Sequence, residues 1–202
     1  MSTVTPRRTM TLEEFRDLPE DETADRMLLR GVVVETVREE CDVTRRNRRH
    51  ALIEAEIARQ IGNWIKQQPE IPGLVFSGEV GCEFPEQETS FGIDVAFFSK
   101  ERLQEQVTDG PYISGAPLLA VEILSPSDVQ KEIQRKTDIY LEAGTQVVWV
   151  VDPHFRTVTV FKRETSPSMF SGNDQLLTEP LLPGFEVTVS TFFDCLDAVP
   201  GV

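Results

Sequence analysis

Cationic side chains are scarce in this sequence. The 202 residues hold 20 Lys and Arg against 34 Asp and Glu, for a formal net charge of −14. This balance excludes a protein that grips nucleic acid mainly through a broad basic surface. One basic cluster, TRRNRRH at residues 44–50, places four arginines in seven positions. It could contact phosphates, but charge runs are more often simply solvated, so a solvated loop before a helix is the favoured interpretation.

Cysteine and long apolar runs are also lacking. Cys41, Cys82 and Cys195 are unevenly spaced and form no CxxC pair, which excludes a disulfide framework and a thiolate zinc site. No stretch approaches the ~20 apolar residues of a membrane span, and the N-terminal MSTVTPRRTM has no apolar signal core. We therefore expect a soluble protein of the reducing cytoplasm, without a membrane partner.

Composition and length favour one folded domain. With 40% hydrophobic and 27% charged residues, the chain can bury a core, but 202 residues fall short of two well-filled domains. No internal repeat divides it. We expect a single domain over residues 1–202, in which an N-terminal helix and strand extension (1–48) and a C-terminal strand and helix extension (166–202) flank a core at 49–165.

Hydrophobic periodicity predicts an α/β (α+β) fold with a mixed sheet flanked by helices. TLEEFRDLP predicts a short leading helix capped by Thr9 or Thr11, and the apolar residues around Gly31 predict a hairpin or bulged strand. The helix at 50–67 carries an apolar stripe of Ile53, Ile57, Ile61, Trp64 and Ile65. Strands are expected at 73–84, 91–100, 117–124, 145–152 and 154–163, with a connector at 101–117, a helix at 125–144, and a last strand and short helix near the C-terminus.

Two carboxylates fall inside apolar strands. The strand period of two aligns Asp94 with Ala96 and Phe98, and it aligns Glu122 with Ala120 and its other apolar neighbours. An unpaired buried charge costs several kcal/mol. Each acid must therefore find a cation, a metal or a proton.

The following helix supplies a cation. Lys136 shares one stripe with Val129, Ile133, Tyr140 and Ala143, which directs it at the sheet. Two acids and one lysine can bind a divalent cation through oxygen ligands and steady a phosphate. The alternative is a Glu122–Lys136 ion pair without a metal. That alternative leaves Asp94 uncompensated, so the metal site is favoured.

At these residues the chain resembles the Uma-type restriction endonuclease family of the PD-(D/E)XK nuclease superfamily. The resemblance is carried by Asp94, the strand VEILSPSD with Glu122, Lys136 on the next helix, Tyr140, Ala143 and Gly144, and the VVWVVDP that follows. The leading TLEEFRDLP and the later LLPGFEV extend it over nearly the whole chain.

The resemblance implies a restriction-endonuclease-like core that hydrolyses phosphodiester bonds of DNA with Mg²⁺ or Mn²⁺. Asp94 would be the metal-binding aspartate, Glu122 the (D/E) position, and Lys136 the relocated lysine that orients water or stabilises the transition state. The main-chain carbonyl of Ile123 could add a ligand, because hard cations accept backbone oxygen. A homodimer is one expected assembly, since enzymes that cut both strands often match the two-fold symmetry of a duplex.

The chain departs from the family pattern at four positions. Ile93 replaces the proline before the aspartate, and Leu124 stands where the superfamily usually has its lysine. Glu132 replaces an aspartate, and Met27 replaces an N-terminal glutamate. An alternative function is therefore a catalytically inactive nuclease-fold module that binds DNA or a protein partner.

Other polar residues receive structural interpretations. Glu54 lies at the edge of the helix stripe, where a solvated side chain is favoured over a metal ligand. His50 and His154 are isolated and show no metal spacing. We expect Ser125 and Ser127 to cap a helix, and Tyr140 and Trp149 to pack in the core.

Overall fold

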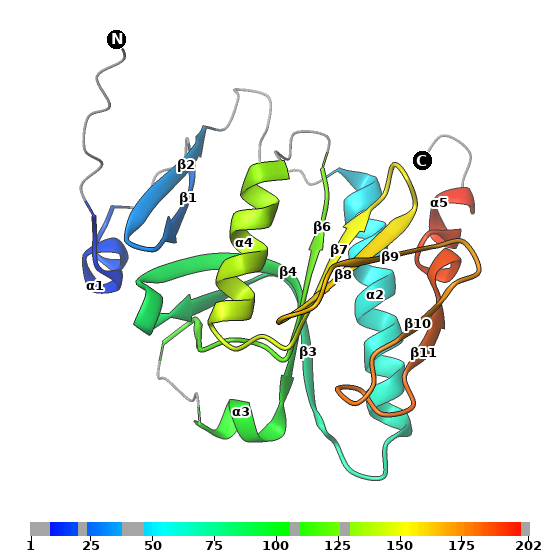
Figure 1. Cartoon of the computed structure of the whole chain (residues 1–202). Helices are drawn as coiled ribbons and strands as arrows, with labels where there is room; N and C mark the ends of the chain where they lie inside the picture. Colours follow the sequence, from blue (N-terminus) through cyan, green and yellow to red (C-terminus); the bar gives the residue numbers. More distant parts are fainter. Residues whose placement is uncertain (1–8, 20–23, 38–46, 106–109, 126–129, 199–202) are drawn as a thin grey trace.

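A computed structural model describes residues 9–19, 24–37, 47–105, 110–125 and 130–198 (Figure 1). Its helices are α1 (Leu12–Arg16), α2 (Arg48–Gln67), α3 (Lys100–Glu105), α4 (Gln130–Glu142) and α5 (Asp194–Asp197). Its strands are β1 (Ala24–Leu29), β2 (Val32–Val37), β3 (Gly73–Phe84), β4 (Thr89–Ser99), β5 (Ile113–Ser114), β6 (Leu119–Ile123), β7 (Val147–Asp152), β8 (Thr157–Lys162), β9 (Ser168–Ser171), β10 (Gln175–Leu177) and β11 (Glu186–Thr188). No helix within these ranges is long and apolar enough to cross a membrane.

The main sheet has the order β2-β1-β4-β6-β7-β8-β9, with β3 paired to β4 and β5 paired to β3. Most neighbouring strands are antiparallel, but β6 and β7 run parallel and are joined through α4. The carboxyl ends of β6 and β7 therefore lie at the same edge of the sheet. This mixed sheet flanked by helices confirms the predicted fold class.

Helices α2 and α4 cover opposite faces of the sheet (Figure 1). The stripe of α2 packs on the face that carries Val95, Phe97 and Trp149. Ile139 and Tyr140 of α4 pack on the other face. The predicted apolar stripe of α2 is confirmed, since Ile53, Ile57 and Ile61 are fully buried and Trp64 nearly so.

The N-terminal elements hold α4 in place. Thr11 caps α1 with a reciprocal capping box, as one of the two predicted caps. Arg30 and Gly31 form the two-residue turn between β1 and β2, both with positive φ, so the predicted hairpin is confirmed. This hairpin is tied to α4, because Arg135 donates a hydrogen bond to the carbonyl of Leu29 at 3.0 Å and Arg30 pairs with Glu142.

Two expectations about the elements were incomplete, and a third is described only in part. The segment at 101–117, expected to be a connector, contains α3 and β5, and β9 and β10 were not predicted. The described part of the helix expected from residue 125 begins at Gln130. Ser127 and Val129 lie outside the described residues, as do Cys41 and the first two arginines of the basic cluster.

The packing of α2 can be tested with Ile57→Ala. Ile57 is fully buried between α2 and the sheet, so removing three carbons should lower the free energy of unfolding by about 2–5 kcal/mol. Urea denaturation followed by circular dichroism measures this loss. Leu52→Ala is the matched control, because Leu52 is 37% exposed on the same helix and its loss should stay within about 0.5 kcal/mol. Equal losses in the two variants would contradict the packing described here.

Candidate functional site

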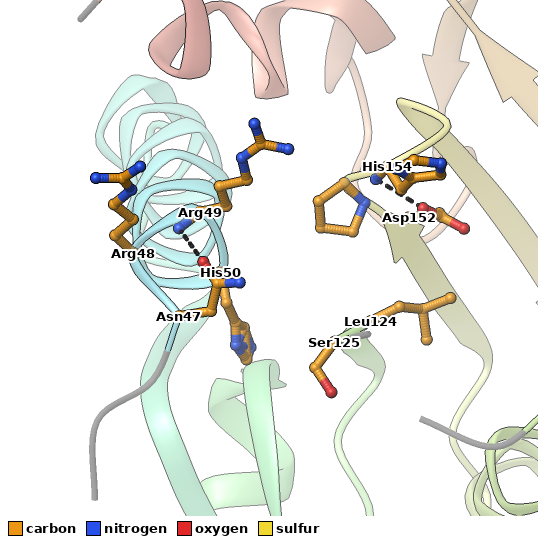
Figure 2. Close-up of a pocket in the computed structure, with 9 residues that line it drawn as sticks. Asn47, Arg48, Arg49, His50, Leu124, Ser125, Asp152 and His154 are labelled. Carbon is orange, nitrogen blue, oxygen red and sulfur yellow. Dashed lines mark hydrogen bonds between the residues drawn. The ribbon is translucent and has the colours of Figure 1, made fainter. Parts of the chain in front are cut away.

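A pocket of about 790 Å³ opens where the start of α2 meets the ends of β6 and β7 (Figure 2). Its lining residues are Asn47, Arg48, Arg49, His50, Leu124, Ser125, Asp152, Pro153 and His154. Clefts at the carboxyl ends of parallel strands are frequent ligand sites in α/β folds. His50 is the lining residue that also contacts Asp94, so the pocket adjoins a buried carboxylate.

Asp94 lies where β4 and β6 diverge. The ladder between these strands ends at Val95 and Val121. Beyond it, Oδ2 of Asp94 accepts a hydrogen bond from the amide of Ile123 at 2.8 Å. The carboxylate thus replaces the backbone acceptor that a continued ladder would supply. Asp94 is only 7% exposed, and this amide bond offsets part of its desolvation.

The alternation of β4 breaks at Asp94. Ile93 packs on the α4 side of the sheet and Val95 on the α2 side, although alternation would put them on one side. Opposite Asp94, β3 has a register shift between Ser77 and Val80, where two residues face one. The expectation that Asp94 shares the face of Ala96 and Phe98 was therefore wrong, because its carboxylate reaches His50 of α2.

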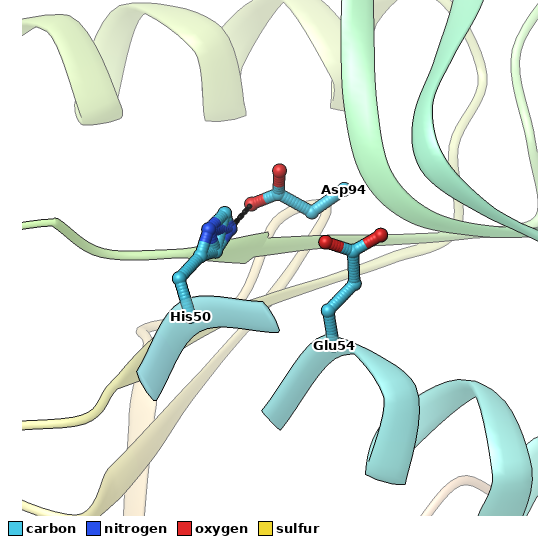
Figure 3. Close-up of side chains that lie close together, drawn as sticks. All are labelled: His50, Glu54 and Asp94. Carbon is cyan, nitrogen blue, oxygen red and sulfur yellow. Dashed lines mark ion pairs between the residues drawn. The ribbon is translucent and has the colours of Figure 1, made fainter. Parts of the chain in front are cut away.

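Helix α2 presents His50 and Glu54 to Asp94 (Figure 3). His50 Nε2 lies 3.1 Å from Asp94 Oδ2. Glu54 is 7% exposed and accepts a hydrogen bond from the amide of Gly78, whose positive φ belongs to the irregular turn of β3. One helical turn separates the two residues on α2, so both face the sheet.

His50, Glu54 and Asp94 offer ligand atoms that all lie within 4.8 Å of one another. Two carboxylates and an imidazole make a donor set that suits Mn²⁺ and also accepts Mg²⁺. The expectations that His50 is isolated and that Glu54 is solvated were wrong. Their spacing of four residues on a helix was the signal that could have paired them.

Glu122 and Lys136 form the second part of the site. Lys136 Nζ lies 2.8 Å from Glu122 Oε2, and the hydroxyl of Tyr140 donates a hydrogen bond to Oε1. The side chains of Glu122 and Lys136 are 13% and 22% exposed. Lys136 thus faces the sheet as its stripe predicted, and Tyr140 packs in the core with its hydroxyl bonded locally.

Burial raises the pKa of the Glu122 carboxyl above its ordinary value. The Lys136 ammonium lowers this pKa, and the charge of Asp94 raises it again. Burial also raises the pKa of Tyr140, so its hydroxyl remains a donor to Glu122. The structure therefore brings Lys136 to Glu122, and it brings Asp94 to the Ile123 amide next to them. It also brings His50 and Glu54 of α2 to the side of Asp94 that faces away from the Glu122–Lys136 pair.

A mixed sheet between two layers of helices, with carboxylates where its strands diverge, is a restriction-endonuclease-like fold. A crystal structure described as "a putative nuclease belonging to DUF820", from Anabaena variabilis, has the same fold, with a TM-score of 0.76 and 24% sequence identity. The alignment covers 93% of this chain and 99% of that one. Residues 12–190 match the Uma2 family, described as "Putative restriction endonuclease", and the chain belongs to this family. A comparison with curated proteins found no match.

The Glu122–Lys136 pair can be tested with Lys136→Met. This variant leaves the mostly buried Glu122 without its cation, which should lower the free energy of unfolding by about 3 kcal/mol at neutral pH, because both side chains are partly exposed. Because the pKa of Glu122 is raised on folding, the folded protein holds this proton more tightly than the unfolded chain does. The free energy of unfolding therefore falls as the pH rises above about 4. Removing the ammonium raises that pKa further, so the loss should be smaller at pH near 4. Urea denaturation across this range measures both effects.

The double variant Glu122→Leu with Lys136→Met is the control for that loss. It removes both charges, so it should recover most of the stability that Lys136→Met alone loses. A loss in the double variant equal to the sum of the losses in Lys136→Met and in Glu122→Leu alone would show that the pair is not coupled.

Proposed function

We propose that this protein is a metal-dependent endonuclease that hydrolyses phosphodiester bonds of DNA. The observation that carries this proposal is the cluster of His50, Glu54 and Asp94 beside the Glu122–Lys136 pair. Membership of the Uma2 family supports it independently. Carboxylates that converge on one point are stabilised by a divalent cation. A lysine beside them can stabilise the negative charge of a phosphate group that binds to that cation.

Asp94 and Glu122 are the proposed metal ligands, with the carbonyl of Ile123 as a backbone ligand. His50 and Glu54 extend the ligand set on the α2 side. Hydrogen bonds already fix Asp94 through the Ile123 amide and Glu54 through the Gly78 amide. Such outer partners hold ligands in a binding geometry and tune their affinity. The imidazole of His50 favours Mn²⁺ over Mg²⁺, because Mg²⁺ prefers oxygen ligands.

A divalent cation would lower the pKa of water and neutralise charge that develops on the phosphate. Within the chain, Lys136 would orient the attacking water or stabilise the transition state. Its 22% exposure lets the ammonium reach a phosphate while it stays paired with Glu122. Tyr140 holds the other oxygen of Glu122, so the carboxylate cannot rotate away from Lys136. Cutting both strands of a duplex through a homodimer stays a prediction.

A catalytically inactive module that binds DNA or a protein partner is the second candidate. It is favoured by one observation, because both oxygens of Glu122 have hydrogen-bond partners within the chain. In such a module the pair would be structural, and Glu122 would not take part in metal binding. Metal binding and DNA cleavage separate the two candidates.

The nuclease proposal is tested by nicking of supercoiled plasmid in Mn²⁺ or Mg²⁺. The wild type should nick the plasmid. Asp94→Asn should reduce the rate by roughly 10²-fold or more, because it removes a charged group that meets the metal. Nicking by Asp94→Asn at the wild-type rate would expose a contaminant and defeat the proposal.

Metal binding is tested separately by calorimetric titration with Mn²⁺. His50→Ala should weaken Mn²⁺ affinity about ten-fold or more, because it removes one member of the cluster. His154→Ala is the matched control, since it deletes the other histidine of the chain, which lies outside the cluster, and should leave Mn²⁺ affinity unchanged. No heat of binding in the wild type would favour the inactive module.

A further inference from the structure

We propose that the pocket beside the metal cluster receives an unpaired strand of nucleic acid, with Arg49 on its phosphates and Phe155 stacked on a base. The substrate would then be DNA with single-stranded nucleotides at the cut. This inference rests on the proposed nuclease function and narrows its substrate class. It follows from the charge of one wall of the pocket and from the exposed aromatic ring next to the other wall.

One wall of the pocket carries positive charge in a strongly acidic protein. The net charge is −14, yet Arg48 and Arg49 are exposed and line the pocket next to His50. In Figure 2 the side chain of Arg49 extends toward the side that holds Asp152 and His154, and Arg48 points the other way. Arg49 is thus placed to contact a phosphate inside the pocket, one residue from a member of the metal cluster.

An exposed aromatic ring lies next to the other wall, in contact with the lining residue His154. Phe155 follows the lining residue His154, and its residue is 72% exposed. The two rings meet edge to face with centroids 4.8 Å apart. An exposed aromatic beside a cationic groove is the arrangement on which unpaired bases stack.

The turn that holds Phe155 is fixed from both sides. Oδ1 of Asp152 accepts hydrogen bonds from the amides of His154 and Phe155 at 2.8 and 3.0 Å. Arg156 makes two hydrogen bonds to Asp197 of α5, at 2.7 and 2.6 Å. The ring is therefore presented on a braced turn, so little conformational entropy is lost when a base stacks on it.

The size of the pocket is compatible with a single strand. A volume of about 790 Å³ is in the range that encloses a small-molecule ligand, so it can hold one or two nucleotides. A single strand bound in this pocket would pass next to His50 of the metal cluster.

The test measures binding without cleavage. Fluorescence anisotropy of the full chain in Ca²⁺ compares a labelled single-stranded DNA of about 20 nucleotides, the duplex of the same sequence, and the matching RNA strand. Single strands should bind about ten-fold tighter than the duplex, and the DNA and RNA arms then name the preferred sugar. Equal affinity for the single strands and the duplex would overturn the proposal.

Variants locate the contact. Phe155→Ala should weaken single-strand binding roughly 5-fold to 100-fold, and Phe155→Trp should retain it. Arg49→Gln should weaken binding and reduce the slope of log affinity against log salt by about 1. Ile71→Ala is the matched control and should bind as the wild type does, because Ile71 is 65% exposed beyond the far end of α2, a 20-residue helix about 30 Å long. Equal binding by Phe155→Ala and Ile71→Ala would overturn the stacking role.

Cleavage in Mn²⁺ separates this inference from the proposed function. Tight, Phe155-dependent binding of a single strand without any cleavage would uphold the strand pocket and overturn the nuclease. Cleavage of duplex DNA with unchanged rate and affinity in Phe155→Ala would uphold the nuclease and overturn the strand pocket.

Discussion

The hydrogen bond from the Ile123 amide to the Asp94 carboxylate is the contact on which the site depends. It forms where the β4–β6 ladder stops, so a side chain completes what the backbone leaves open. Because the carboxylate is held at this point, it lies between α2 on one face of the sheet and Glu122 on the strand beside it. Regular alternation would have sent Asp94 to the α4 side with Ala96 and Phe98, away from His50 and Glu54 of α2.

Hydrogen bonds from the chain stabilise the three buried acids of the site. Glu54, Asp94 and Glu122 are mostly buried. Within the described part of the chain, Glu122 pairs with the partly exposed Lys136, and Asp94 contacts His50, which is charged only when protonated. Each acid has at least one hydrogen bond from the chain, which makes the arrangement tolerable in the folded protein. A divalent cation bound between these carboxylates would stabilise their negative charge further.

Regular periodicity was enough to predict part of this structure. The stripe of α2 and the direction of Lys136 follow from helical spacing alone, and both were correct. The surroundings of Asp94 could not be predicted in this way, because they depend on an irregular turn of β3 that changes the alternation of the neighbouring strand. Helical spacing could have paired His50 with Glu54 on α2, but it does not show that Asp94 lies beside them. Asp94 reaches them through long-range pairing of strands, about which the period of a single segment carries no information.

Lys136 reaches Glu122 from a helix, so the position of its ammonium depends on how that helix is held. A lysine on β6 would be positioned by the sheet itself, whereas Lys136 takes its position from α4, which is anchored through Arg135 to the carbonyl of Leu29 on the N-terminal hairpin. The hairpin therefore helps to fix the position of the ammonium beside Glu122. The electrostatic environment of Glu122 thus depends on a part of the chain that contributes no residue to the lining of the pocket.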